Sequence, residues 1–273
     1  MGSQTTYELE LSVVIAARPA TIYRFFEDPE RFSDWLAAKV SFEPRPGSAM
    51  RIHFPADGSP DCPEGAVMAG EVLEVEDARR FAFTWGHQGG EHEAELPPGS
   101  SRVEITLTPH DDGTLVTLRH SCLPSEEQRD LHTPGWRHYL SQLSLKSTQV
   151  ELGDVAHETV GAWFAAWSET DAGARATLLE NSWHANGRFQ DDYAFAEGLE
   201  AINAHIGMAQ MYMPGMVLQA DGAVQVCHAN VRFGWKMTDP DGNAVFTGAN
   251  FGELAADGRL KRLVGFADVP PAE

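Results

Sequence analysis

A short run of metal-ligating residue types lies in the first half of the chain. His87 and His92 stand five residues apart in a glycine-containing segment, with Glu91 and Glu93 beside them. Imidazole and carboxylate groups are ordinary ligands of transition metals. Their spacing matches no established metal-binding template, however, and such a run is typical of a solvated hairpin loop. The sequence therefore predicts no metal site.

Other signatures of cofactor chemistry are missing from the sequence. It contains no Walker loop, GxGxxG fingerprint, nucleophile elbow or HExxH motif. The three cysteines, Cys62, Cys122 and Cys227, are far apart and odd in number, which is typical of reduced thiols rather than of a disulfide framework. We therefore expect no nucleotide, flavin or nicotinamide cofactor, and a cytoplasmic location.

Length and charge limit the classes of function. The 273 residues correspond to about two domains of ordinary size, and 42% hydrophobic residues suffice for two cores. The 40 acidic and 20 basic residues give a net charge of −20, which argues against binding nucleic acid or an anionic membrane. No apolar run approaches the length of a membrane span, and the opening MGSQTTYELE has no features of a secretory signal.

The first half reads as one long antiparallel sheet and a terminal helix. Residues 7–15 alternate between apolar and polar, Pro19 suits the start of a short helix, and a second helical piece covers 29–36. Residues 125–150 carry apolar side chains at mostly helical spacing, with an expected break at Pro134–Gly135. Six further strands are predicted near 38–43, 49–54, 67–75, 79–86, 101–108 and 113–120.

A sheet this long must curl, and its concave face needs a cover, for which the terminal helix is large enough. A helix held by a curved sheet commonly leaves an apolar hollow in which small ligands bind. Trp35, Trp85 and Trp136 are the candidate ligand contacts in this half, although buried aromatic residues are more often plain core.

The second half begins with helices and ends with strands. From residue 154, Val155, Thr159, Trp163 and Trp167 recur every four residues and define an apolar helix face. The order of elements predicts an α+β cone, again hollow. The further helices are expected at 172–180 and 197–211, and the strands at 183–189, about 216–238 with a turn at Asp221–Gly222, 243–255 and 259–268.

Both halves resemble known families. The segments VVIAARPATIYRFFEDPERFSDWL, GEVLEVEDARRFAFTWG, SRVEITLTPHDDGTLVTLRHS and GWRHYLSQL resemble the START-like helix-grip superfamily (SRPBCC), in the branch of the heat-shock-protein-90 ATPase activator homologues. The segments VGAWFAAWSETD, GRFQDDYAFAEGLEAINAHI, MPGM and VRFGWKMTDPDGNAVFTGANFGELAADGRLKRLVGF resemble SnoaL-like members of the nuclear-transport-factor-2-like superfamily. The resemblance implies a helix-grip domain over residues 5–150 and a cone-shaped α+β barrel domain over 154–269.

The second resemblance implies a site. Its catalytic members place an acidic general base before the third helix, and Asp191 falls at that position, followed by Asp192 where proline is usual. Such a base needs partial desolvation to raise its pKa toward neutrality. In an extended segment only one of the two carboxylates would face the cavity, and the pair could instead simply cap a turn.

Proton abstraction also needs a group that stabilises the developing oxyanion. Asn250, His184 and Tyr193 are the preferred candidates for this role, with Asn250 standing where many relatives have an ionisable Asp. Trp163, Tyr212 and Trp235 are the expected ligand contacts of this half. The wider set of hydrogen-bonding candidates also includes His205, Tyr212 and His228.

The sequence thus leaves three hypotheses of function. The first is a protein that binds a small hydrophobic or aromatic molecule in a cavity. The second is a cofactor-independent isomerase, polyketide-cyclase-like enzyme or dehydratase with Asp191 as base. The third is a co-chaperone-like interaction module, implied by the name of the first family. A homodimer through the sheet of the second half is expected by resemblance.

Overall fold

The computed structural model describes residues 6–36, 38–56, 65–90 and 92–268. The chain folds into two compact units, Met1–Ser147 and Thr148–Glu273. Each unit combines one sheet with helices, so the predicted α+β fold class is confirmed. Among the described helices, none is long and apolar enough to cross a membrane.

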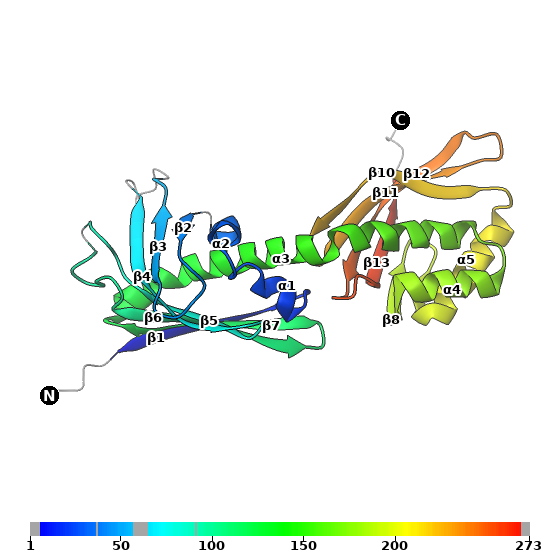
Figure 1. The fold of residues 1–273 in the computed structure, drawn as a ribbon. Coiled ribbons are helices and arrows are strands. Elements are labelled where there is room, and N and C mark those ends of the chain that lie inside the picture. Colours follow the sequence, from blue (N-terminus) through cyan, green and yellow to red (C-terminus); the bar gives the residue numbers. More distant parts are fainter. Residues whose placement is uncertain (1–5, 37, 57–64, 91, 269–273) are drawn as a thin grey trace. The chain divides into compact units, whose positions relative to one another are not determined.

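The first unit is built on a seven-stranded antiparallel sheet (Figure 1). Its strands follow the order β1-β7-β6-β5-β4-β3-β2, so the first strand pairs with the last and the others form a meander. The alternation read from the sequence reproduces these strands closely. Their bounds are β1 Tyr7–Ile15, β2 Lys39–Ser41, β3 Ala49–Phe54, β4 Ala66–Glu76, β5 Arg80–Trp85, β6 Ser101–His110 and β7 Gly113–Leu123.

Helices cover one face of this sheet. The short helices α1 (Pro19–Tyr23) and α2 (Pro29–Leu36) bury Phe32, Trp35 and Leu36 in an aromatic core. The long helix α3 (Glu126–Ser168) lies across the sheet with its first part, which buries Trp136, Leu140 and Leu143 in that same core (Figure 1). This unit is a helix-grip arrangement, with a sheet around a long C-terminal helix.

The predicted break at Pro134–Gly135 is wrong, because α3 continues through both residues. Proline in a helix interior removes one backbone hydrogen bond and costs about 3 kcal/mol. The nearby burial of Trp136 and Leu140 offsets this cost, since fully burying a large apolar side chain is worth roughly 1.5–3 kcal/mol. Tertiary packing therefore overrides the local preference.

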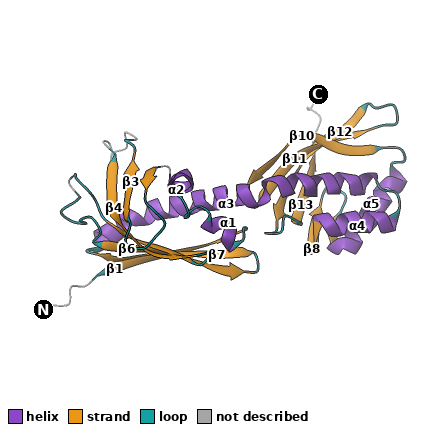
Figure 2. Ribbon diagram, in the orientation of Figure 1, coloured by secondary structure: helices purple, strands orange, loops and turns teal. Residues whose placement is uncertain are grey.

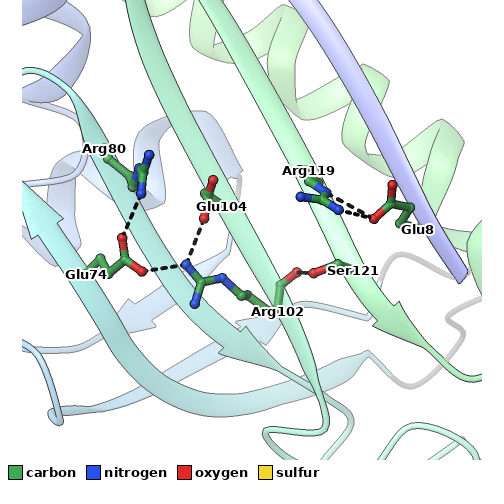
Figure 3. Close-up of polar contacts among 7 residues, drawn as sticks. All are labelled: Glu8, Glu74, Arg80, Arg102, Glu104, Arg119 and Ser121. Atoms are coloured by element: carbon green, nitrogen blue, oxygen red, sulfur yellow. Dashed lines mark hydrogen bonds and ion pairs between the residues drawn. The ribbon is translucent and has the colours of Figure 1, made fainter. Parts of the chain in front are cut away.

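The opposite face of the first sheet carries charged side chains (Figure 3). Glu74 forms ion pairs with Arg80 at 3.2 Å and with Arg102 at 2.6 Å, and Arg102 also contacts Glu104 at 2.7 Å. Hydrogen bonds from Arg102 and Arg80 hold the pKa of Glu74 below its ordinary value. These charged groups are partly exposed, so each ion pair adds little stability. Their presence shows that this face of the sheet is in contact with solvent.

The second unit contains a six-stranded mixed sheet in the order β10-β11-β12-β13-β8-β9. β13 and β8 pair in parallel, and the other pairs are antiparallel. Helix α5 packs on β8 and against α4 (Figure 2). The elements after α3 are α4 Ala172–Ser182, β8 Trp183–Gln190, β9 Phe195–Glu197, α5 Gly198–Tyr212, β10 Val217–Cys227, β11 Asn230–Thr238, β12 Ala244–Leu254 and β13 Leu260–Ala267.

One turn of this sheet differs from the prediction. β10 continues through Asp221 and Gly222, where the register with β11 shifts, and the chain reverses only between Cys227 and Asn230. His228 adopts a positive φ of 53° in that two-residue connection. A bulge accommodates the positive φ of Gly222 without ending the strand, which is why the Asp-Gly signal was misleading.

Candidate functional site

A cavity of about 490 Å³ lies in the second unit. Its walls come from the C-terminal part of α3, from α5 and from the sheet, and the segment after β8 closes one side. Seven aromatic and three methionine side chains make most of the lining. These are Trp163, Trp167, Phe189, Tyr193, Tyr212, Trp235, Phe246, Met208, Met213 and Met237. A cavity of this size with mostly apolar walls suits a small organic molecule.

Sequence spacing explains how α3 supplies part of this wall. Trp163 and Trp167 are one helical turn apart, so both indoles project from the same face. Their rings meet at nearly right angles, with centroids 5.7 Å apart, and Trp163 also contacts Phe189 at 5.2 Å. Edge-to-face aromatic contacts of this kind hold the wall in a fixed shape.

Asp191 stands where β8 ends, in a turn formed by its own side chain. Its Oδ1 accepts hydrogen bonds from the backbone N–H groups of Tyr193 at 2.9 Å and Ala194 at 2.6 Å. An aspartate that binds the following N–H groups is a standard turn former. The segment is therefore not extended, and both Asp191 and Asp192 border the cavity, Asp191 half-buried and Asp192 exposed. The condition of an extended segment, on which the prediction of a single inward carboxylate depended, is therefore not met, although Asp192 is exposed to solvent as expected for the second carboxylate.

The second carboxylate oxygen of Asp191 faces His205 on α5. The distance from Asp191 Oδ2 to His205 Nε2 is 3.7 Å, which is slightly too long for a hydrogen bond. His205 Nε2 is buried and has no hydrogen-bond partner among the described residues. The imidazole is held between the rings of Trp167 and Phe189, at centroid distances of 5.8 and 5.4 Å. Asp191 and His205 thus form a carboxylate–imidazole pair inside an aromatic wall.

The environment of Asp191 favours its ionised form. Burial alone would raise the pKa of Asp191, but His205 and the N–H groups of Tyr193 and Ala194 outweigh burial and hold that pKa below its ordinary value. The expectation of a pKa raised toward neutrality is therefore wrong. An ionised carboxylate of low pKa is a weak base, and it is better suited to orienting an imidazole or attracting a positive charge.

Asn250 on β12 lies beside this pair. It is 4% exposed and lines the cavity, and its carboxamide has no hydrogen bond to any described residue. Asn250 pairs across the sheet with Gly265, whose missing side chain leaves room in the cavity. A Cβ at position 265 would lie 2.9 Å from Asn250 Oδ1 and 3.6 Å from Asp191 Cβ. Gly265 therefore keeps open the space between Asn250 and Asp191.

The structure brings together most of the residues predicted for the second half. Asp191, Asn250 and Tyr193 border the cavity, as do three predicted ligand contacts, Trp163, Tyr212 and Trp235. Tyr193 and Tyr212 are 88% and 81% exposed, which places them at the rim. His184 is not among the lining residues; it lies near Asp257 instead.

The three predicted contacts in the first half lie in its core. Trp35 is fully buried among Phe26 and Phe32. Trp85 and Trp136 pack against each other, with their ring centroids 5.2 Å apart. Their mutual packing is what a filled interior requires.

Two histidines are bonded to these tryptophans. The indole N–H of Trp85 donates to His132 Nε2 at 3.2 Å, and that of Trp136 donates to His120 Nδ1 at 3.1 Å. Both imidazoles therefore accept on one nitrogen, which requires their neutral form.

The histidine run of the first half forms no metal cluster in the described part of the chain. His87 and His92 approach each other, with ring centroids 5.3 Å apart, and Glu91 lies outside the described residues, as does Cys62. Cys122 and Cys227 are both exposed and unpaired.

Several residues of the cavity were not singled out from the sequence as site residues. Trp167 has a clear signal, since it stands four residues after Trp163 on the same predicted helix face. His205 was only one of several hydrogen-bonding candidates, because nothing in the sequence places it against Asp191. Gly265 had no signal, since an isolated glycine in a strand does not show what it faces.

Comparisons with known proteins bear on both units. Residues 16–145 match the sequence profile of the family described as activator of Hsp90 ATPase homolog 1-like protein. The AHSA1-like protein of Rhizobium etli, solved by NMR, is 33% identical over 52% of this chain and 82% of its own, with a TM-score of 0.38. A proposed isomerase of the SnoaL-like family from Agrobacterium tumefaciens is 30% identical over 42% of this chain and 99% of its own, with a TM-score of 0.41. No curated protein matches the chain.

The first unit is thus a helix-grip domain by fold. Its residues 16–145 are similar to the family of activator of Hsp90 ATPase homolog 1-like proteins.

Proposed function

We propose that the second unit binds a small, largely apolar molecule in the cavity beside Asp191, His205 and Asn250. The observation that carries this proposal is the cavity itself: about 490 Å³ of space with aromatic walls and one carboxamide, that of Asn250, which forms no hydrogen bond with the described residues. Three buried ring nitrogens of lining residues, Trp163 Nε1, Trp167 Nε1 and His205 Nε2, have no hydrogen-bond partner among the described residues. Buried polar groups without partners are costly, so a ligand that bonds to them would recover that energy. We also propose that residues 5–150 form the helix-grip domain and residues 154–269 a SnoaL-like domain.

Native mass spectrometry of the intact protein, purified gently from cells, tests the proposal. We expect a small-molecule adduct that is released on denaturation. Ala209→Phe should weaken retention of the adduct, because Ala209 lines the cavity and a benzyl group there would project into it. Ala204→Phe is the matched control, since Ala204 lies exposed on the same helix. No adduct in the wild type, together with no binding of added 2-naphthylmethanol, would refute the proposal.

A second candidate function, proton transfer, is favoured by the pairing of Asp191 with His205. With Nε2 of His205 turned toward the Asp191 carboxylate, Nδ1 is the nitrogen left to exchange a proton with a ligand. Asp191 would then orient the imidazole, and Asn250 would donate to a ligand carbonyl. In this arrangement His205 is the base, and Asp191 acts through it.

Deuterium uptake from D2O into the methyl group of 2-acetylnaphthalene measures such a transfer. We expect uptake faster than in buffer, lost in both Asp191→Asn and His205→Gln and retained in His184→Gln. Uptake that persists in His205→Gln would remove that residue from the reaction.

The predicted homodimer remains a proposal. Large apolar side chains are exposed on the strands of the second sheet, among them Val217, Val245, Phe251 and Phe266, and the last two rings contact each other at 6.0 Å. Light scattering of the wild type and of Phe251→Glu tests it, with a dimer expected for the first and a monomer for the second. The co-chaperone alternative rests on the family description alone.

A further inference from the structure

The charges that line the cavity are of one sign. Asp191 and Asp192 are the carboxylates at its wall, and none of the described lining residues is a lysine or an arginine. His205 is cationic only when protonated. His205 is the one ion-pair partner of Asp191 among the described residues, and no lysine or arginine in that part of the chain pairs with this carboxylate. An anionic ligand would be repelled here, and a cationic one would be attracted.

The geometry of Asp191 leaves one oxygen available. Oδ1 is occupied by the N–H groups of Tyr193 and Ala194, whereas Oδ2 has only the imidazole of His205 at 3.7 Å. Asn250 is 4% exposed and forms no hydrogen bond with the described residues, and it adds a carboxamide across the space that Gly265 leaves open. A donor placed in that space would reach both acceptors.

The aromatic walls of the cavity also favour a cationic ligand. Aromatic faces attract cations through the ring quadrupole, most strongly for tryptophan, and the interaction is worth more when water is excluded. Trp163, Trp167 and Phe189 stand next to the Asp191–His205 pair. A carboxylate and several aromatic rings around one hollow form an environment that recognises an organic ammonium ion.

We propose that the ligand of this cavity is an aromatic or apolar amine, bound as the cation, with its ammonium group between Asp191 Oδ2 and Asn250 and its apolar body against the aromatic walls. This inference rests on the proposed ligand-binding function and names the ligand class. It excludes carboxylates and phosphates as ligands of the same site.

Three probes of one shape test the ligand class: 2-naphthylmethylamine, 2-naphthylmethanol and 2-naphthoate. Their affinities are measured by calorimetry on the intact chain at pH 8, above the ordinary pKa of an imidazole and below that of a primary amine. We expect the amine to bind at least tenfold more tightly than the alcohol, and the naphthoate to bind most weakly. Asp191→Asn should bring amine and alcohol within twofold of each other, while Glu200→Gln, the same change of charge at an exposed site on α5, should leave the ratio unchanged.

The outcomes separate the two proposals. Alcohol or naphthoate binding as tightly as the amine in the wild type overturns the ligand class but leaves the ligand-binding function standing. Amine affinity that is unchanged in Ala209→Phe would show attraction to the acidic surface instead of binding in the cavity, which also overturns the inference. Failure of all three probes to bind, with no adduct in native mass spectra, would refute the ligand-binding function itself. Asparagine at position 191 can still accept the two backbone hydrogen bonds, and circular dichroism verifies that this variant folds.

Discussion

Acid should destabilise the first unit through histidines that its interior keeps neutral. His87, His120 and His132 lie in one cluster. The distance between ring centroids is 6.2 Å for His87 and His132 and 5.0 Å for His120 and His132. Burial, with the neighbouring His132 and His92, lowers the pKa of His87 to about 4. Burial is also the largest cause that lowers the pKa of His120 and His132, and protonating either would remove the acceptor of a tryptophan N–H.

The sign and size of the effect follow from linkage. The unfolded chain takes up protons as the pH falls below about 6.5, whereas the folded form of His87 resists protonation down to about 4. Stability is therefore complete above pH 6.5 and falls across this interval. At about 1.4 kcal/mol per pH unit, His87 alone accounts for a loss of about 3 kcal/mol by pH 4 and about 2 kcal/mol at pH 5. Carboxylates with lowered pKa, such as Asp191, lose their contribution only below this interval.

Urea unfolding of the intact chain, followed by the indole N–H NMR signals of Trp85 and Trp136, reports on the first unit alone. Between pH 7.5 and pH 5 the wild type should lose about 2 kcal/mol more of its unfolding free energy than His87→Gln does. His53→Gln, an exposed histidine in the same unit, should follow the wild type. Equal losses in the wild type and His87→Gln, within about 0.5 kcal/mol, would show that the folded unit does not hold His87 neutral.

Two further predictions concern the second unit. Arg175 is 4% exposed and donates hydrogen bonds to Asn203 Oδ1 at 2.6 Å, to Gln210 Oε1 at 3.0 Å and to the carbonyl of Glu169 at 2.9 Å. Arg175→Met removes these bonds, so it should lower the free energy of unfolding by about 3 kcal/mol in chemical denaturation. A loss below about 1 kcal/mol would contradict this. Gly265→Ala places a Cβ 2.9 Å from Asn250 Oδ1, so it should weaken 2-naphthylmethylamine binding at least tenfold in calorimetry with the fold retained, and unchanged affinity would show that the ligand lies elsewhere.

The fold could be predicted from the sequence to a large extent. Strict alternation in 7–15 and 101–108 and the four-residue spacing of Val155, Thr159 and Trp163 are local patterns, and each produced the expected strand or helix. The two errors, at Pro134 and at Asp221–Gly222, have a common cause. A local signal for a break or a turn was overridden by contacts of distant residues, namely the core around Trp136 and the pairing of β10 with β11.

The chemistry of the site could be predicted only as a set of residue types. The sequence supplied an aspartate at residue 191, an asparagine at 250 and several candidate donors, and it determined that aromatic side chains would face a hollow. Only the tertiary structure selected His205 as the neighbour of Asp191, lowered the pKa of that carboxylate and set Gly265 beside Asn250. These features depend on which side chains from α5, β12 and β13 meet across the cavity, and such meetings are fixed by packing between elements rather than by spacing along the chain.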